Sequence, residues 1–222
     1  MINDYIKQNS RVDTILGPSI FGLQVPEDIF KRLVKLSEDV WERKDHISWN
    51  DQLVGHLKYQ YYVPHDQLKE YDVYNFFMQC FYWYITESSS HWKNNSDSMV
   101  IELEAFWINY QEEGEYNPMH NHGQATISGA LHLKEPEYEI SKERKHHRDG
   151  VLSIVNHAPI MYELDNYSMD VHPTPRGMYL WPASLLHVVY PFTGKGQRVS
   201  MAYNAVHYNS NNPDNRHTVK NY

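Results

Sequence analysis

The second half of the chain consists of short segments with the composition of β-strands. From Ser98 onward, runs rich in β-branched and aromatic residues are separated by turns that contain Gly, Pro or Asn. These runs are MVIELEAFWINYQ, ATISGALHL, VLSIVNH, GMYLWP, LHVVYP and RVSMAYNAVHY. Many short strands separated by turns are typical of an antiparallel sandwich or barrel. We therefore predict a mainly β fold, an antiparallel jelly roll, for this half of the chain.

The first half of the chain contains two helical patterns. Pro26 occupies the place of a first-turn proline, and apolar residues between 30 and 41 recur at helical spacing. A second apolar stripe predicts a helix from about Asp66 to Glu87. We expect these two N-terminal helices to support the β core.

The domain organisation follows from these patterns. We expect residues 1–222 to form a single domain, since this length suits one core. Within it, residues 1–97 are predicted to form a helical support region and residues 98–208 the β core. Residues 209–222 are polar and are predicted to form a tail.

Composition argues against several classes of protein. A net charge of −8 does not suit a protein whose main partner is a nucleic-acid backbone. No apolar stretch approaches the roughly 20 residues that a membrane-spanning helix needs. The single cysteine, Cys80, and the absence of a recognisable secretory signal predict a cytoplasmic protein. The sequence leaves the oligomeric state open, with a homodimer among the options.

Three histidines are candidate metal ligands. His120 and His122 stand one residue apart in the segment GEYNPMHNHG, and residues i and i+2 of a strand face the same side. His187 lies at the start of a later apolar strand, and a jelly roll brings distant strands together. Oxygenases usually hold Fe(II) with two histidines and a carboxylate on one face. The three histidines are therefore a candidate metal site.

A candidate anion site follows the third histidine. Arg198 comes after ten intervening residues, and Ser200 lies two residues further along the same predicted strand. A guanidinium and a hydroxyl on one face of a strand form a suitable cradle for a carboxylate.

Together these motifs resemble the 2-oxoglutarate/Fe(II)-dependent oxygenase superfamily, and in particular a bacterial and phage subfamily with an H-x-H motif. The resemblance covers about residues 100–206 and the helical half only loosely. Its motifs are Trp107-Ile108-Asn109, Gly114, His120-Asn121-His122, Ser128-Gly129, Gly177 to His187 through Pro182, Arg198-Val199-Ser200 and Asn204. One departure is His132, where the pattern has an aromatic residue.

The resemblance implies a double-stranded β-helix core of the jelly-roll, cupin-like kind, and roles for the site residues. His120 and His187 would be iron ligands, and His122 occupies the position of the usual carboxylate. Arg198 would pair with the distal carboxylate of 2-oxoglutarate, with Ser200 beside it. Asn109 and Tyr110 lie on a strand that helps to hold the cosubstrate in related enzymes; the two side chains face opposite ways, so only one is expected to do so.

The resemblance also implies the cofactors and the reaction. The superfamily uses Fe(II), 2-oxoglutarate and dioxygen, and couples oxidative decarboxylation of 2-oxoglutarate to hydroxylation of a substrate. The sequence does not distinguish a small-molecule substrate from a peptidyl one.

The charge pattern of residues 134–149 predicts a mobile connection over or beside the site, either a solvated loop or a lid.

Two other interpretations compete with this one. A cupin metalloprotein without a cosubstrate would share the segment from Gly114 to His122, but it would lack a role for Arg198 and Ser200. A metal-free jelly roll would bind a ligand or partner, with the histidines only hydrogen-bonded.

Overall fold

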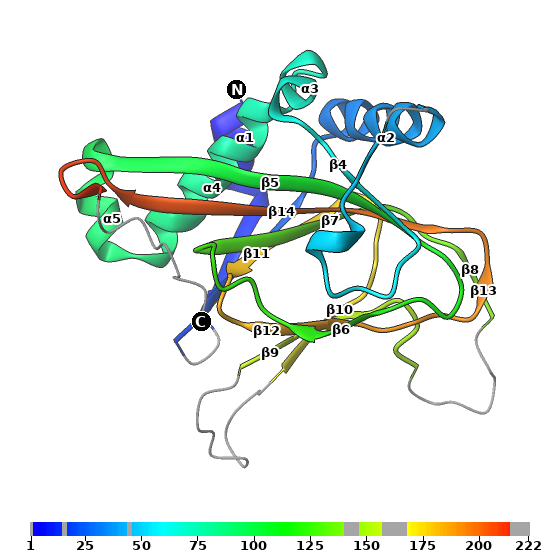
Figure 1. The fold of residues 1–222 in the computed structure, drawn as a ribbon. Coiled ribbons are helices and arrows are strands. Elements are labelled where there is room, and N and C mark those ends of the chain that lie inside the picture. The colour runs from blue at the N-terminus through cyan, green and yellow to red at the C-terminus, as the bar shows by residue number, and fades with distance from the viewer. Residues whose placement is uncertain (1, 15–16, 44–45, 140–146, 157–167, 214–222) are drawn as a thin grey trace, which may run out of the picture.

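The structure is a computed structural model that describes residues 2–14, 17–43, 46–139, 147–156 and 168–213 (Figure 1). Two sequence predictions fall partly outside these ranges. Residues 140–146 of the predicted mobile connection and residues 214–222 of the predicted tail are not described.

Two antiparallel sheets form the core, which confirms the prediction of a mainly β fold. The larger sheet has eight strands in the order β1-β2-β11-β7-β14-β5-β4-β3. Their bounds are β1 Ser10–Thr14, β2 Ser19–Gln24, β3 Ile47–Ser48, β4 Tyr59–Tyr62, β5 Met99–Gln111, β7 Ile127–Lys134, β11 Gly177–Pro182 and β14 Arg198–Asn209. The second sheet has four strands in the order β10-β9-β12-β6, and Figure 1 shows it below the larger sheet.

The strands of the second sheet are β6 Asn117–His120, β9 Leu152–Val155, β10 Ser168–Val171 and β12 Leu186–Val189. A short pair, β8 (Glu137–Tyr138) with β13 (Gly194–Lys195), completes the described strands. The described α-helices are α1 Ile2–Asn9, α2 Glu27–Glu42, α3 His65–Glu70, α4 Tyr74–Ser88 and α5 Ser90–Asn94. Within the described ranges, no helix has the length and apolar character that crossing a membrane requires.

Helices α2 and α4 cover one face of the larger sheet. Phe77 of α4 packs edge-on against Phe106 of β5 and also contacts Tyr203 of β14. The hydroxyl of Tyr110 donates to the backbone oxygen of Ser37 in α2 at 2.6 Å. Because side chains alternate along a strand, the residues between these positions face the second sheet instead. The functional site therefore lies on the side of the larger sheet away from the helices.

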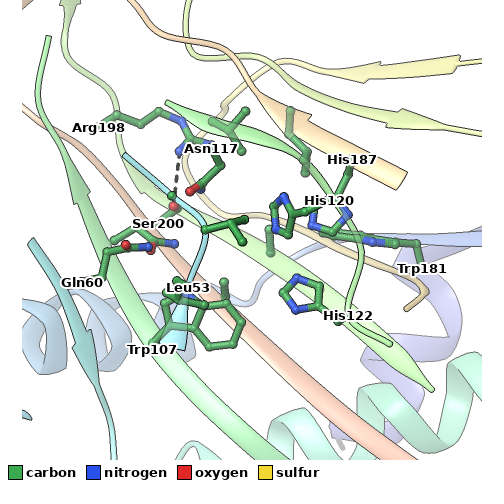
Figure 2. A pocket seen from close by; sticks show the side chains of 18 residues that line it. Leu53, Gln60, Trp107, Asn117, His120, His122, Trp181, His187, Arg198 and Ser200 are labelled. Carbon is green, nitrogen blue, oxygen red and sulfur yellow. Dashed lines mark hydrogen bonds between the residues drawn. The ribbon is translucent and has the colours of Figure 1, made fainter. Parts of the chain in front are cut away.

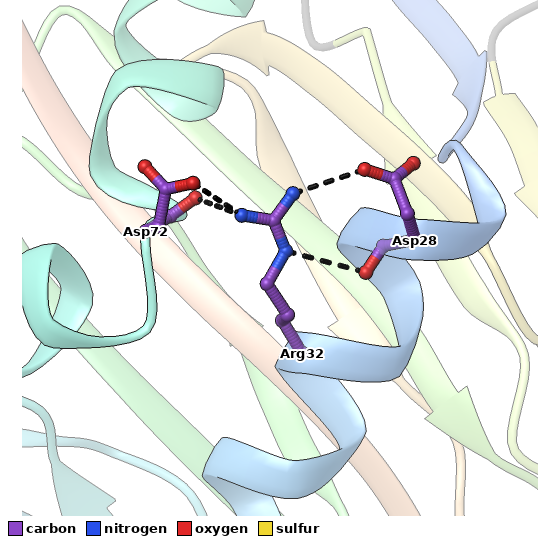
Figure 3. A network of polar contacts seen from close by, with 3 residues as sticks. All are labelled: Asp28, Arg32 and Asp72. Atoms are coloured by element: carbon purple, nitrogen blue, oxygen red, sulfur yellow. Dashed lines mark hydrogen bonds and ion pairs between the residues drawn. The ribbon is translucent and has the colours of Figure 1, made fainter.

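The second predicted helix is interrupted. The structure has α3 and α4 in its place, and Asp72 between them has a φ of 53°. A residue in the left-handed region ends a helix, and Asp tolerates this region better than most residues. Arg32 of α2 fixes the junction, because it donates to the backbone oxygen of Asp72 at 2.9 Å and to the carboxylates of Asp72 and Asp28 (Figure 3).

The first 97 residues supply more than helical support. Strands β1 to β4 belong to the larger sheet, with β2 paired to β11 and β4 paired to β5. The sequence of these strands is too short to show a clear period. They take strand structure because partners far along the chain offer them a hydrogen-bonded edge. The short helices α1 and α5 were also not predicted.

Candidate functional site

The three candidate metal ligands converge at one place. His120 ends β6, His122 follows two residues later, and His187 on β12 pairs directly with His120 across the second sheet. One ring nitrogen of each residue lies within 4.8 Å of the other two. The ring centroids of His120 and His187 are 4.2 Å apart, and His122 lies 5.1 Å from each (Figure 2). No described Cys, Asp or Glu joins this cluster.

Backbone carbonyls orient two of the three rings. Nδ1 of His120 lies 2.7 Å from the oxygen of Pro118, and Nδ1 of His187 lies 3.2 Å from the oxygen of Leu185. A carbonyl only accepts, so Nδ1 of each ring must carry the proton. The lone pair then resides on Nε2, the tautomer that a metal ligand needs.

Burial keeps the three rings neutral. It lowers the pKa of His120, lowers the pKa of His122 to about 4, and lowers the pKa of His187 well below its usual range. Neighbouring histidines of the cluster lower the pKa of His122 and of His187 further, because like charges repel. Neutral imidazoles have a lone pair to offer at neutral pH, and metal binding requires it.

A pocket between the two sheets joins the histidines to Arg198. Figure 2 shows the histidines on one side, Arg198 and Ser200 on the other, and Leu53 between them. The remaining part of the wall is mostly apolar, with a few neutral polar groups. Its residues include Val54, Gly55, Gln60, Trp107, Asn109, Asn117, Leu152, Trp181 and Val189.

Arg198 is a buried cation whose described partners are all neutral. It is 3% exposed; its Nη1 donates to Gln111 Oε1 at 3.1 Å and to Ser200 Oγ at 3.3 Å, and its Nη2 donates to His132 Nε2 at 2.9 Å. Within the described residues its Nε has no hydrogen-bond partner, and Glu135 acts on it through space without a described ion pair. Burial lowers its pKa to about 10, so it stays charged at pH 7. A buried charge without a counter-ion is costly, and an anionic ligand would relieve that cost.

Asn109 and Tyr110 point to opposite faces of the larger sheet. Asn109 lines the pocket, and its Oδ1 accepts from Gln60 Nε2 at 2.9 Å. Tyr110 faces the opposite side of the sheet, where it bonds to α2. Tyr110 is therefore not placed to contact a ligand in the pocket, and only Asn109 of the two candidates is.

Two residues beside Arg198 were not predicted as site residues. Gln111 lies opposite Arg198 in the β14–β5 register, and His132 lies opposite Ser200 in the β14–β7 register. His132 gave a signal, because it departs from the aromatic residue of the family pattern. Gln111 gave none, since its position depends on strand register.

Comparison with known proteins identifies a similar family for the segment that holds this site. Residues 105–204 match the family described as "Putative 2OG-Fe(II) oxygenase". This segment runs from within β5 to within β14, and it contains the histidine cluster and Arg198. The segment is therefore similar to the 2-oxoglutarate/Fe(II)-dependent oxygenases. That family uses Fe(II), 2-oxoglutarate and dioxygen, as predicted. A search of curated proteins finds no match.

Solved structures confirm the jelly-roll fold of these oxygenases. A Pseudomonas putida prolyl-4-hydroxylase is 16% identical, with a TM-score of 0.55 over 91% of this chain and 96% of its own. A Trichoplax adhaerens prolyl hydroxylase, in complex with a peptide of hypoxia inducible factor, is 9% identical, with a TM-score of 0.54 over 100% and 92% of the two chains.

A third solved structure with the same fold is that of an enzyme named for a different reaction. The α-ketoglutarate-dependent carbocyclase SnoK from nogalamycin biosynthesis is 9% identical, with a TM-score of 0.56 over 92% of this chain and 82% of its own. At these identities the likeness concerns the fold, and a fold alone does not select the reaction.

Proposed function

We propose that this protein is an Fe(II)- and 2-oxoglutarate-dependent hydroxylase. The observation that carries the proposal is the pairing, in one pocket, of a three-histidine cluster with a buried arginine whose described hydrogen-bond partners are all neutral. A bound metal ion would account for the histidine cluster, and a bound diacid would account for the buried arginine. A cupin without a cosubstrate would leave the charge of Arg198 unexplained.

His120, His122 and His187 are the proposed iron ligands. Three neutral imidazoles suit Fe(II), and the carbonyls behind His120 and His187 are the outer contacts that ligand histidines usually make. With His122 in the place of the usual carboxylate, the centre carries one more positive charge. A dianionic cosubstrate offsets that charge, so iron and 2-oxoglutarate are expected to bind cooperatively.

Arg198, Ser200 and Asn109 are the proposed cosubstrate residues. Arg198 Nε lacks a partner and Ser200 Oγ lies beside the guanidinium, so an incoming carboxylate finds donors ready on one face of β14. Asn109 lies opposite Ser200 in the register of β5 with β14. The bound Fe(II) and 2-oxoglutarate would supply the oxidation itself, which consumes dioxygen and yields succinate, carbon dioxide and a hydroxylated product.

The proposed substrate presents an uncharged group to the iron. Trp107 and Trp181 border the histidine side of the pocket, and none of the described side chains that line it is acidic. Solved structures with this fold include prolyl hydroxylases and a carbocyclase, so the choice of hydroxylation is part of the proposal and does not follow from the fold. The substrate is a small molecule or a peptidyl residue.

An anaerobic titration tests the proposal. Purified protein receives Fe(II) alone, 2-oxoglutarate alone, and then both, while the visible spectrum is recorded. We expect a charge-transfer band that needs both additions. Arg198→Ala should still bind the metal but should need at least tenfold more 2-oxoglutarate, because an unpaired carboxylate loses about 1.5–3 kcal/mol. Metal binding that 2-oxoglutarate does not affect would favour the cupin interpretation.

A further inference from the structure

Asn204 contacts the ring of His122 through its side-chain amide. Asn204 lies on β14, and its amide nitrogen is 3.1 Å from Nδ1 of His122. On its other side, the amide oxygen accepts from the hydroxyl of Ser128 at 2.9 Å. Ser128 of β7 is buried and lies directly opposite Asn204 in the strand register. The side chains of Ser128, Asn204 and His122 therefore form a hydrogen-bonded series that runs from β7 through β14 to the histidine cluster.

Strand alternation places the amide on the pocket side of β14. Arg198, Ser200 and Ala202 line the pocket, and Asn204 is the next residue on the same face. The β14–β5 register shifts only after Asn204, between Asn204 and Ala205. The contact with His122 therefore belongs to the regular part of β14.

The chemistry of the proton decides which end of the amide faces His122. If the amide N–H donates to Nδ1, the lone pair of Nδ1 is used and the proton of the neutral ring resides on Nε2. A nitrogen that carries a proton cannot bind a metal. If instead the amide oxygen accepts from an Nδ1–H, the lone pair resides on Nε2 and is free. Nitrogen and oxygen of an amide have nearly the same shape, and the hydroxyl of Ser128 can donate or accept, so both orientations fit the space.

We propose that Asn204 presents its oxygen to Nδ1 of His122 in the metal-loaded protein and that Ser128 holds the amide in that orientation. Asn204 is thus a positioning residue that acts through His122. Its oxygen would accept the Nδ1 proton of His122, as the carbonyls of Pro118 and Leu185 accept the Nδ1 protons of the other two rings. The inference rests on the iron site of the proposed function and assigns two further residues to it.

Replacement of Asn204 by aspartate and by leucine distinguishes between the two orientations of its amide. Asn204→Asp keeps an acceptor for the Nδ1–H and removes the donor, whereas Asn204→Leu removes both at similar volume. We expect Asn204→Asp to bind Mn(II) at least as tightly as the parent, because the carboxylate also adds a negative charge. Asn204→Leu should bind it about 10–100-fold more weakly, the usual effect of losing such an outer partner.

Two controls accompany the measurement. Asn209→Leu makes the same change at the far end of β14 and should leave Mn(II) affinity unchanged. A histidine ¹⁵N spectrum of the Zn(II)-loaded parent should show His122 with its proton on Nδ1, and Asn204→Asp should preserve that signature. Thermal unfolding of each variant reports whether the fold is intact.

Each remaining outcome contradicts the inference. Equal weakening in Asn204→Asp and Asn204→Leu would show that the amide N–H is the important contact. Unchanged affinity in both variants would show that Asn204 does not position His122. A parent that binds no Mn(II), Zn(II) or Fe(II) would instead refute the proposed function itself, and that result is obtained before any variant is made.

Discussion

At the scale of single residues, the site relies on neutral acceptors to hold a charged group. The guanidinium of Arg198 can only donate, so Nε2 of His132 must offer its lone pair and Nδ1 must carry the proton. That Nδ1 has no partner within the described residues. Burial lowers the pKa of His132 well below its usual range, and the charge of Arg198 lowers it further. His132 therefore stays neutral and leaves the positive charge of Arg198 available to a ligand.

This arrangement predicts a pH dependence of folding stability. In the unfolded chain His132 takes up a proton near pH 6.5, whereas in the folded protein it does so only at much lower pH. The stability that depends on neutral His132 is complete above pH 6.5 and decreases as the pH falls below it. His132→Phe should remove this component, so the free energy of unfolding of the parent should fall relative to that of the variant by up to about 1.4 kcal/mol per pH unit below pH 6.5, and the two curves should meet and then cross.

Urea unfolding of the metal-free protein between pH 7.5 and 5 measures this difference. At pH 7.5 the variant should be less stable by about 1 kcal/mol, because Arg198 loses one hydrogen bond. Parallel curves for parent and variant across this range would show that His132 is protonated to the same extent in the folded and unfolded states.

At the scale of elements, packing distances determine which glycines of the larger sheet leave room for a larger side chain. A Cβ on Gly129 of β7 would lie 2.2 Å from the ring of Tyr203, 2.7 Å from Leu180 and 2.8 Å from the backbone oxygen of Tyr179. A Cβ on Gly22 of β2 would meet only the ring of Tyr179, at an ordinary 3.7 Å.

Gly129→Ala should therefore destabilise the protein by about 1–3 kcal/mol, as overpacked cores do. Gly22→Ala is the matched control in the same sheet and should be neutral or slightly stabilising, because alanine restricts the unfolded chain. Urea unfolding at constant pH compares the two variants with the parent. Similar free energies of unfolding for both would mean that β7 shifts to admit the methyl group.

The elements also show what the sequence can and cannot predict. The helix at α2 was predictable, because apolar period is a local property. The convergence of His120 and His187 followed from the expected jelly roll, which brings distant strands together. His122 joins them although β6 ends at His120, so the strand spacing expected for His120 and His122 is not what places it. The helix break at Asp72 was not predictable, because it depends on an unusual φ that Arg32 fixes from another helix. Strands β1 and β2 were missed as well, since long-range pairing determines their structure.

At the scale of the whole molecule, the pocket takes its two ends from different sheets. His120 and His187 belong to the second sheet, whereas Arg198 and Ser200 belong to the larger sheet. A metal bound at one end and a diacid that reaches the other would connect the two sheets. Ligands that bind only the folded protein stabilise it by mass action, so the connection should appear in thermal unfolding.

In the presence of Mn(II), 2-oxoglutarate at about 100 times its dissociation constant should stabilise the parent by about 2.7 kcal/mol, or roughly 5–10 °C in Tm. At the same concentration, 2-oxopentanoate should give a much smaller shift, because it keeps the 2-oxo acid group but lacks the distal carboxylate that Arg198 is proposed to bind. In Arg198→Ala the two ligands should give similar small shifts, while the shift caused by Mn(II) alone should remain. Equal shifts by the two ligands in the parent would mean that the distal carboxylate does not reach Arg198, and that the buried charge serves another anion.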